Sequence, residues 1–144
     1  MSSFGAGSKI KTIQKSITFT GASGLGLAGT AVPLATVTGR VIIHGMLPYC
    51  TNNLTEAQAT AQISLGTTTQ VTRFIGNTNS TAINTDEWWL TTTPTAGSLD
   101  LPDAMQMVIC SENLIINPIT QNTNGGTLVI DILWEPITSN GAVT

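Results

Sequence analysis

The chain has 144 residues, the size of one domain, and only 9% of them are Asp, Glu, Lys or Arg, against about 25% in an average soluble domain. No apolar run approaches the roughly 18 residues that span a bilayer, and two cysteines are too few for a disulfide framework. A surface with so few charged residues gives weak colloidal repulsion, so we expect an oligomer or an assembled particle. Without a membrane-spanning run, we expect no membrane partner.

The N-terminal residues form a basic arm. Met1–Ser8 is rich in Gly and Ser, and we expect it to be flexible or ordered only by a partner. Lys9, Lys11 and Lys15 are three of the five cations, and without them the net charge falls from −3 to −6. Such an arm suits an acidic neighbour, whereas nucleic acid needs a clustered basic face; a solvated strand that carries lysines is the alternative. Without a signal-peptide pattern, we expect the chain to remain in a cytoplasm unless lysis releases it.

The first half of the chain contains three predicted strands. Lys9–Thr20 alternates apolar and polar residues, with a bulge between its isoleucines. Gly21–Gly29 is a predicted loop. Val37–Leu47 is a strand that Pro48 should end, and Glu56–Leu65 alternates small or apolar residues with polar ones at a period of two, which favours strand over helix despite its alanines.

The second half alternates short strands with turns, because apolar pairs at a spacing of two are separated by polar, Gly or Pro residues. In chain order we predict a turn at Gly66–Gln70, a strand at Val71–Ile75, a polar loop at Asn77–Thr85, a strand at Glu87–Thr93, a loop at Pro94–Pro102, a strand at Met105–Cys110, and a short strand from Asn113 that Pro118 ends.

Thr127–Ile137 is the clearest strand. One face is apolar and the other carries Asp131 and Glu135, which is the pattern of a strand buried on one side. Asn124–Gly126 should form the preceding turn, and Pro136 should end the pairing. The apolar face consists of Leu128, Ile130, Ile132 and Trp134.

These elements predict the fold class. Threonine accounts for 25 residues, and its β-branched side chain favours sheet over helix. Seven or eight short strands without an internal repeat indicate an all-β, single-domain antiparallel β-sandwich or jelly roll. We expect an arm over residues 1–15 and a sandwich domain over residues 16–144.

Two patterns are weak candidates for chemistry. Gly24–Gly29 matches G-x-G-x-x-G, a pattern found in dinucleotide sites. Such a site needs a helix directly after the glycines, and Pro33 and the β-branched residues after it disfavour a helix there. His44 is the only histidine, lies in an apolar strand and has no Gly-x-Ser-x-Gly companion, so a structural role is expected. We predict no enzyme, no cofactor and no small-molecule substrate.

The acidic pairs lie in loops. Asp86 with Glu87 and Asp100 with Asp103 are interpreted as solvated acids, although a bound divalent ion stays open. Cys50 and Cys110 are predicted to be buried free thiols, with one disulfide as the alternative.

Trp88 and Trp89 are neighbours, so in a strand their side chains point to opposite faces. One is then a core residue, while the other is exposed or covered by a partner and is a candidate interface anchor. The alternative is that loops bury both.

Four stretches together resemble small accessory virion proteins of tailed bacteriophages. They occur in the order VTGRV (Val37–Val41), AQISLGT (Ala61–Thr67), TAINTDEWW (Thr81–Trp89) and WEPITSNGAV (Trp134–Val143). None of them is a catalytic signature, and residues 1–36 carry no such likeness.

The resemblance implies a structural role in a virion, as a head decoration (cement) protein that bridges capsomers on the outer capsid surface after assembly in the host cytoplasm. The implied partners are the major capsid protein and copies of this chain, as a homotrimer. The candidate interface residues are Lys9, Lys11, Lys15, Trp88 and Trp89. The alternatives are a tail or fibre component that binds a receptor or glycan through a tryptophan and the loop acids, and a hydrolase that uses His44.

Overall fold

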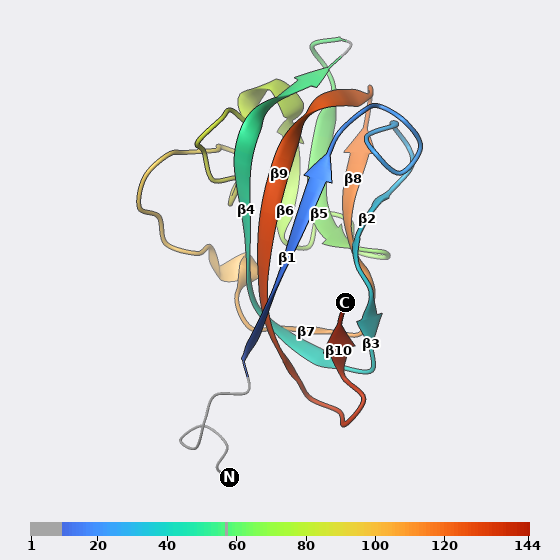
Figure 1. Ribbon diagram of the computed structural model, residues 1–144, viewed down its shortest axis with the longest axis vertical. Helices are drawn as coiled ribbons and strands as arrows, with labels where there is room; N and C mark the ends of the chain where they lie inside the picture. Colours follow the sequence, from blue (N-terminus) through green and yellow to red (C-terminus); the bar gives the residue numbers. More distant parts are fainter. Residues whose placement is uncertain (1–9, 57) are drawn as a thin grey trace.

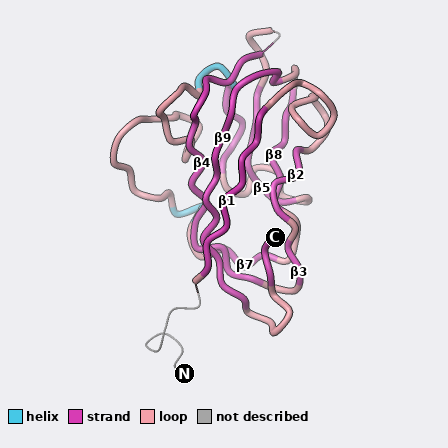
Figure 2. The backbone as a smooth tube through the Cα atoms, viewed as in Figure 1, coloured by secondary structure: helices cyan, strands magenta, loops and turns pink. Residues whose placement is uncertain are grey.

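The computed structural model describes residues 10–56 and 58–144. The chain forms a sandwich of two four-stranded antiparallel sheets, a first sheet with the order β1-β9-β4-β7 and a second with the order β2-β8-β5-β6, together with a two-stranded sheet β10-β3 (Figures 1 and 2). The predicted all-β sandwich is confirmed. The elements are β1 (Lys11–Thr18), β2 (Val32–Ala35), β3 (Val37–Thr38), β4 (Val41–Glu56), β5 (Gln62–Thr67), β6 (Ile75–Asn79), η1 (Ser80–Ala82), η2 (Asp103–Met105), β7 (Val108–Cys110), β8 (Leu114–Ile119), β9 (Thr123–Pro136) and β10 (Ala142–Val143).

The core lies between the two sheets. In the first sheet β9 is flanked by β1 and β4, and its predicted apolar face is buried. Alternate side chains of a strand share one face. On β5 and β8 of the second sheet, the apolar side chains that face the first sheet are buried. The central side chains are Leu128, Ile130 and Ile132 from β9 and Ile63, Leu65, Leu114 and Ile116 from β5 and β8.

Two prolines lie inside strands that they were expected to end. The carbonyl of Pro48 accepts the Trp89 N–H at 2.9 Å, and the carbonyl of Pro118 accepts the Gly29 N–H at 2.9 Å. The N and O of a strand residue point to the same side. The nitrogen of Pro48 therefore points away from β9 and that of Pro118 away from β5, so neither strand needs an N–H from the proline. No ladder bond is lost, so β4 and β8 run past the prolines.

Several predicted boundaries in the middle of the chain are wrong. β4 continues to Glu56 and a turn follows at residues 58–60, so the strand predicted at Glu56–Leu65 begins only at Gln62. The strand predicted at Val71–Ile75 lies later, at Ile75–Asn79, and its last three residues fall in the predicted polar loop. Thr78 is buried there because its hydroxyl is hydrogen-bonded, which satisfies the polar group.

The second half also departs from expectation near the tryptophans. Trp88 forms isolated bridges with Tyr49 and Thr95, not a strand over Glu87–Thr93. Met105 belongs to a 3₁₀ turn, and β7 covers only Val108–Cys110.

The turn predicted at Asn124–Gly126 is instead part of β9. The chain accommodates these residues at an irregular register with β4, where Gly126 has a φ of +99° that glycine adopts without strain. The loop predicted at Gly21–Gly29 is confirmed. Gly39, with a φ of +63°, separates β3 from β4 in the strand predicted over Val37–Leu47.

The N-terminal lysines are only partly described. Lys9 lies outside the described residues, and Lys11 and Lys15 belong to β1, which pairs with β9 along its whole length. The division into an arm at residues 1–15 and a domain at residues 16–144 stays a prediction. Among the described residues, no helix is long and apolar enough to cross a bilayer.

Candidate interaction surfaces

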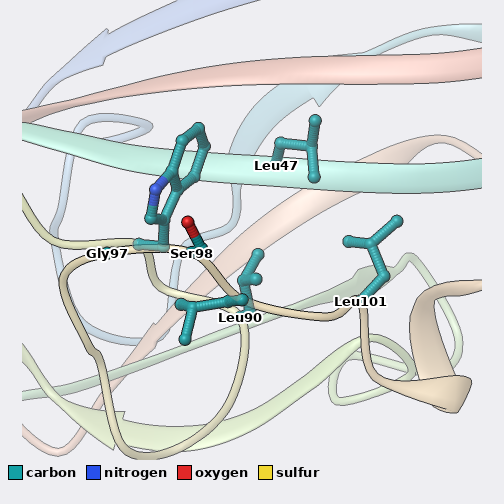
Figure 3. Close-up of a pocket in the computed structure, with 7 residues that line it drawn as sticks. Leu47, Leu90, Gly97, Ser98 and Leu101 are labelled. Atoms are coloured by element: carbon teal, nitrogen blue, oxygen red, sulfur yellow. The ribbon is translucent and has the colours of Figure 1, made fainter.

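An apolar groove lies between β4 and the loop of residues 91–102. It has a volume of about 350 Å³ and is lined by Leu47, Trp88, Leu90, Gly97, Ser98, Leu99 and Leu101. Figure 3 shows Leu47 on β4 with Leu90 and Leu101 across the cavity from it. The lining side chains offer one hydroxyl and one indole N–H, so the groove is suited to an apolar group of a partner.

Trp88 is held at this groove from two sides. Its main-chain N–H donates to the Thr95 carbonyl at 2.9 Å, and the Thr95 N–H donates back at 3.1 Å. Its ring packs against Tyr49, with centroids 4.8 Å apart and planes tilted by 59°, a geometry typical of aromatic pairs. The Tyr49 hydroxyl donates to Asp86 at 3.0 Å, and this hydrogen bond raises the pKa of Tyr49.

Trp89 points the opposite way. It is fully buried in the core, where its indole N–H donates to the Thr78 hydroxyl at 3.0 Å. Trp88 is half-buried. The prediction that one tryptophan is a core residue is therefore confirmed for Trp89, and the alternative that both are buried is wrong because Trp88 is only half-buried. The role of either residue at an interface stays a prediction.

The two described lysines lie on the inner face of β1. The Lys11 ammonium is 5.5 Å from the ring centroid of Trp134, within range of a cation–π contact. Lys15 lines a cavity of about 460 Å³ at the side of the sandwich, together with Leu34, Thr36 and Thr144. The predicted tryptophans and lysines are thus not gathered at one site, since the lysines lie at the β1 edge and Trp88 lies beyond β4.

An exposed apolar pair at the start of β7, formed by Met107 just before the strand and Ile109 within it, was not predicted as a surface. Met107 and Ile109 are 61% and 72% exposed, while Val108 and Cys110 are buried. Ile109 pairs with Ile42 of β4 on the outer face of the first sheet. Both faces of this segment are apolar in sequence, so the alternation could not tell which one is buried.

Beside this pair, a carboxylate is surrounded by hydroxyls. Glu112 accepts hydrogen bonds from Thr67, Thr68 and Thr69. The hydrogen bonds from Thr69 and Thr67 lower the pKa of Glu112, because they stabilise its charged form.

His44 contacts one acid. Its Nε2 lies 2.8 Å from Glu135 Oε1, and each side chain is 16% exposed. No hydrogen bond among the described residues joins His44 to a Ser or Thr hydroxyl. Likewise, within residues 10–56 and 58–144 no group of three or more His, Cys, Asp or Glu side chains could hold a metal ion.

Both cysteines are buried and free, as predicted, and the alternative of a disulfide is wrong. The Cys50 thiol donates to the Asn52 carbonyl at 3.0 Å and the Cys110 thiol to the Glu112 carbonyl at 3.1 Å. Burial raises the pKa of Cys50 to about 11 and also raises that of Cys110.

Comparison with known proteins finds a likeness in fold. No family model matches the sequence, and no characterised protein matches it as a relative. Among solved structures, a chain of the cyanophage Pam1 capsid asymmetric unit has 15% sequence identity and a TM-score of 0.55, over 91% of this chain and 87% of that chain. At that identity the likeness establishes a shared fold.

Proposed function

We propose that this chain is a structural protein of a bacteriophage particle, a head decoration (cement) protein that sits on the outer capsid surface and bridges neighbouring capsomers. The observation that carries the proposal is the shared fold with a chain of a cyanophage capsid asymmetric unit, which extends over 91% of this chain. The sequence resemblance to accessory virion proteins supports the same role.

The surface chemistry fits this proposal. The apolar groove at Trp88 and the exposed Met107 and Ile109 are surfaces that a protein partner can cover. A cement protein binds only the assembled shell, so its binding free energy stabilises that shell against dissociation. In this proposal the partners are the major capsid protein and two further copies of the chain, as a homotrimer at three-fold positions. The chain acts through contacts and carries out no reaction.

The groove favours this role over glycan binding by a tail or fibre protein. A sugar platform needs an exposed aromatic face with several hydrogen-bonding groups around it. Trp88 is half-buried against Tyr49, and its groove is lined mainly by leucines. A side chain such as Leu, Ile or Phe fits that lining better than a hydroxylated ring does.

Cryo-electron microscopy of purified virions tests the proposal. We expect density for this chain on the outer shell, at local three-fold or inter-capsomer positions. Density confined to the tail tip or the fibres would contradict the cement role and favour the receptor-binding alternative. A second test adds the purified protein to shells that lack it and measures the temperature at which the shells dissociate, which should rise.

A further inference from the structure

Strand β1 has one hydrogen-bonding edge with which no strand of residues 10–56 and 58–144 pairs. It is the edge strand of the first sheet and pairs only with β9, in register from Lys11 opposite Trp134 to Thr18 opposite Thr127. In the strand order β1-β9-β4-β7, β9 lies on one side of β1 and no strand of this sheet lies on the other. Such an edge exposes a row of N–H and C=O groups that an extended segment can pair with.

The register identifies which residues carry the free groups. Pro48 and Cys50 of β4 hydrogen-bond to residues 86–89, away from β9. The β9 residues opposite them, Ile130 and Leu128, therefore point their main-chain N–H and C=O groups toward β1. There they face Lys15 and Ile17 and form hydrogen-bonded pairs with them. The N–H and C=O groups of the alternate residues of β1 point away from β9. The free edge therefore consists of the main-chain groups of Thr12, Gln14, Ser16 and Thr18.

The side chains of these residues leave the edge accessible. All four are exposed. Gln14 donates to Asp131 at 2.9 Å and the Thr18 hydroxyl lies 3.2 Å from the Thr127 hydroxyl, so both lie over the outer face of the sheet. No strand of the described chain hydrogen-bonds to this edge, and β2 of the second sheet contacts β1 beside the cavity that Lys15 lines.

The inner side of the same edge is basic and hollowed. Lys11 and Lys15 both face inward, and Lys15 lines the cavity of about 460 Å³ with Leu34, Thr36 and Thr144. The two lysines are four residues apart on one face, which corresponds to about 13 Å along a strand. A strand added to this edge would place alternate side chains beside both ammonium groups.

We propose that the free edge of β1 takes up an extended acidic segment of a shell protein as a fifth strand of the first sheet, with two carboxylates four residues apart facing Lys11 and Lys15. The inference rests on the proposed function, because it names the partner segment that a cement protein of this shape binds. Main-chain hydrogen bonds supply affinity and the two lysines supply selectivity. A second copy of β1 is a poor occupant, since its own lysines would lie near these and repel them.

The first test is the binding of the purified protein to shells that lack it. Ser16→Pro removes a free-edge N–H without touching the β1–β9 ladder, and its ring obstructs an incoming strand. Ser16→Ala is the matched control, because it keeps the N–H. We expect Ser16→Pro to bind at least about tenfold more weakly than the wild type, and Ser16→Ala to bind like the wild type.

The second test changes the charge. Lys15→Glu should weaken shell binding by about tenfold, whereas Arg40→Glu makes the same change in net charge at an exposed turn between β3 and β4 and should have little effect. Wild-type affinity in both Ser16→Pro and Lys15→Glu would overturn the β1 inference and leave the cement role standing. Failure of the wild type itself to bind shells would overturn both.

A third measurement does not depend on the folding of a variant. Hydrogen–deuterium exchange of the wild type, free and bound to shells, reports directly on the edge amides. We expect exchange in the peptides that contain Thr12, Gln14, Ser16 and Thr18 to slow on binding, because those amides gain hydrogen-bond partners. Unchanged exchange in shell-bound protein would contradict strand addition at β1.

Discussion

The indole N–H of Trp89 donates a hydrogen bond to the Thr78 hydroxyl at 3.0 Å, inside the core. The same hydroxyl donates to the Gly76 carbonyl at 3.0 Å. This pair joins the irregular segment after η1 to strand β6 of the second sheet. It therefore holds the base of the segment from which Trp88 reaches the groove.

Thr78→Val should destabilise the protein. The substitution keeps the shape but leaves the buried indole N–H without an acceptor, which costs about 1–3 kcal/mol. Thr78→Ser keeps the hydroxyl and should cost less, since it removes only a methyl group. Urea unfolding followed by tryptophan fluorescence measures both. Equal stabilities for Thr78→Val and the wild type would show that the hydrogen bond contributes nothing net.

The two tryptophans should respond differently to truncation. Trp89→Ala opens a cavity in the core and should cost about 3–5 kcal/mol of unfolding free energy. Trp88→Ala removes a half-buried ring and should cost roughly 1–2 kcal/mol, but it should weaken shell binding by about tenfold if the groove is an interface. The unfolding free energies come from denaturant titration and the affinities from shell sedimentation. Wild-type shell affinity in Trp88→Ala would exclude the groove from the interface.

An element could be predicted from the sequence where its residue pattern is local, and could not be predicted where it depends on contacts between distant residues. β9 was predictable because Leu128, Ile130 and Ile132 share one face while Asp131 and Glu135 lie on the other, and that pattern needs no knowledge of the rest of the chain. The burial of Thr78 was not predictable, because its partner Trp89 lies eleven positions away in a segment that forms no strand. Pro48 was misjudged for a related reason. Whether a proline ends a strand depends on which side its N–H faces, and only the neighbouring strands decide that.

The candidate surfaces show the same division. The opposite orientation of Trp88 and Trp89 followed from adjacency alone. The groove beside Trp88 did not, because it depends on how Leu99 and Leu101 return along β4 through a loop without regular structure. The free edge of β1 required the strand order, which no local pattern contains.

Substitution of two glycines with similar φ angles should distinguish the cost of backbone strain from the cost of a steric clash. Gly126 has a φ of +99°, and a Cβ there would lie 2.4 Å from the Asn53 carbonyl oxygen; Gly97 has a φ of +100° with nothing within 4 Å. Gly97→Ala should cost about 1 kcal/mol, because only the backbone angle is unfavourable. Gly126→Ala should cost about 3 kcal/mol or more, because main-chain atoms must also move. Thermal unfolding of both variants measures the difference, and equal losses would show that the clash at Gly126 relaxes freely.

The buried thiol of Cys50 should make stability fall at alkaline pH. Burial raises the pKa of this thiol to about 11, above the ordinary value of 9.0 that applies in the unfolded chain. Below about pH 9 both states hold the proton and stability is unaffected. Between about pH 9 and pH 11 the unfolded chain releases the thiol proton while the folded protein keeps it. This stabilises the unfolded state relative to the folded state, so the free energy of unfolding decreases.

Cys50→Ala provides the control for this pH dependence, since the raised pKa values of Cys110 and Tyr49 also affect stability at alkaline pH. Urea unfolding at intervals from pH 8 to pH 11 should show a steeper loss of stability for the wild type than for Cys50→Ala. The same burial predicts that a maleimide at pH 8 labels Cys50 only after denaturation, because the thiol is both inaccessible and protonated in the folded protein. Parallel pH profiles together with rapid labelling of the native protein would show that this thiol reaches solvent.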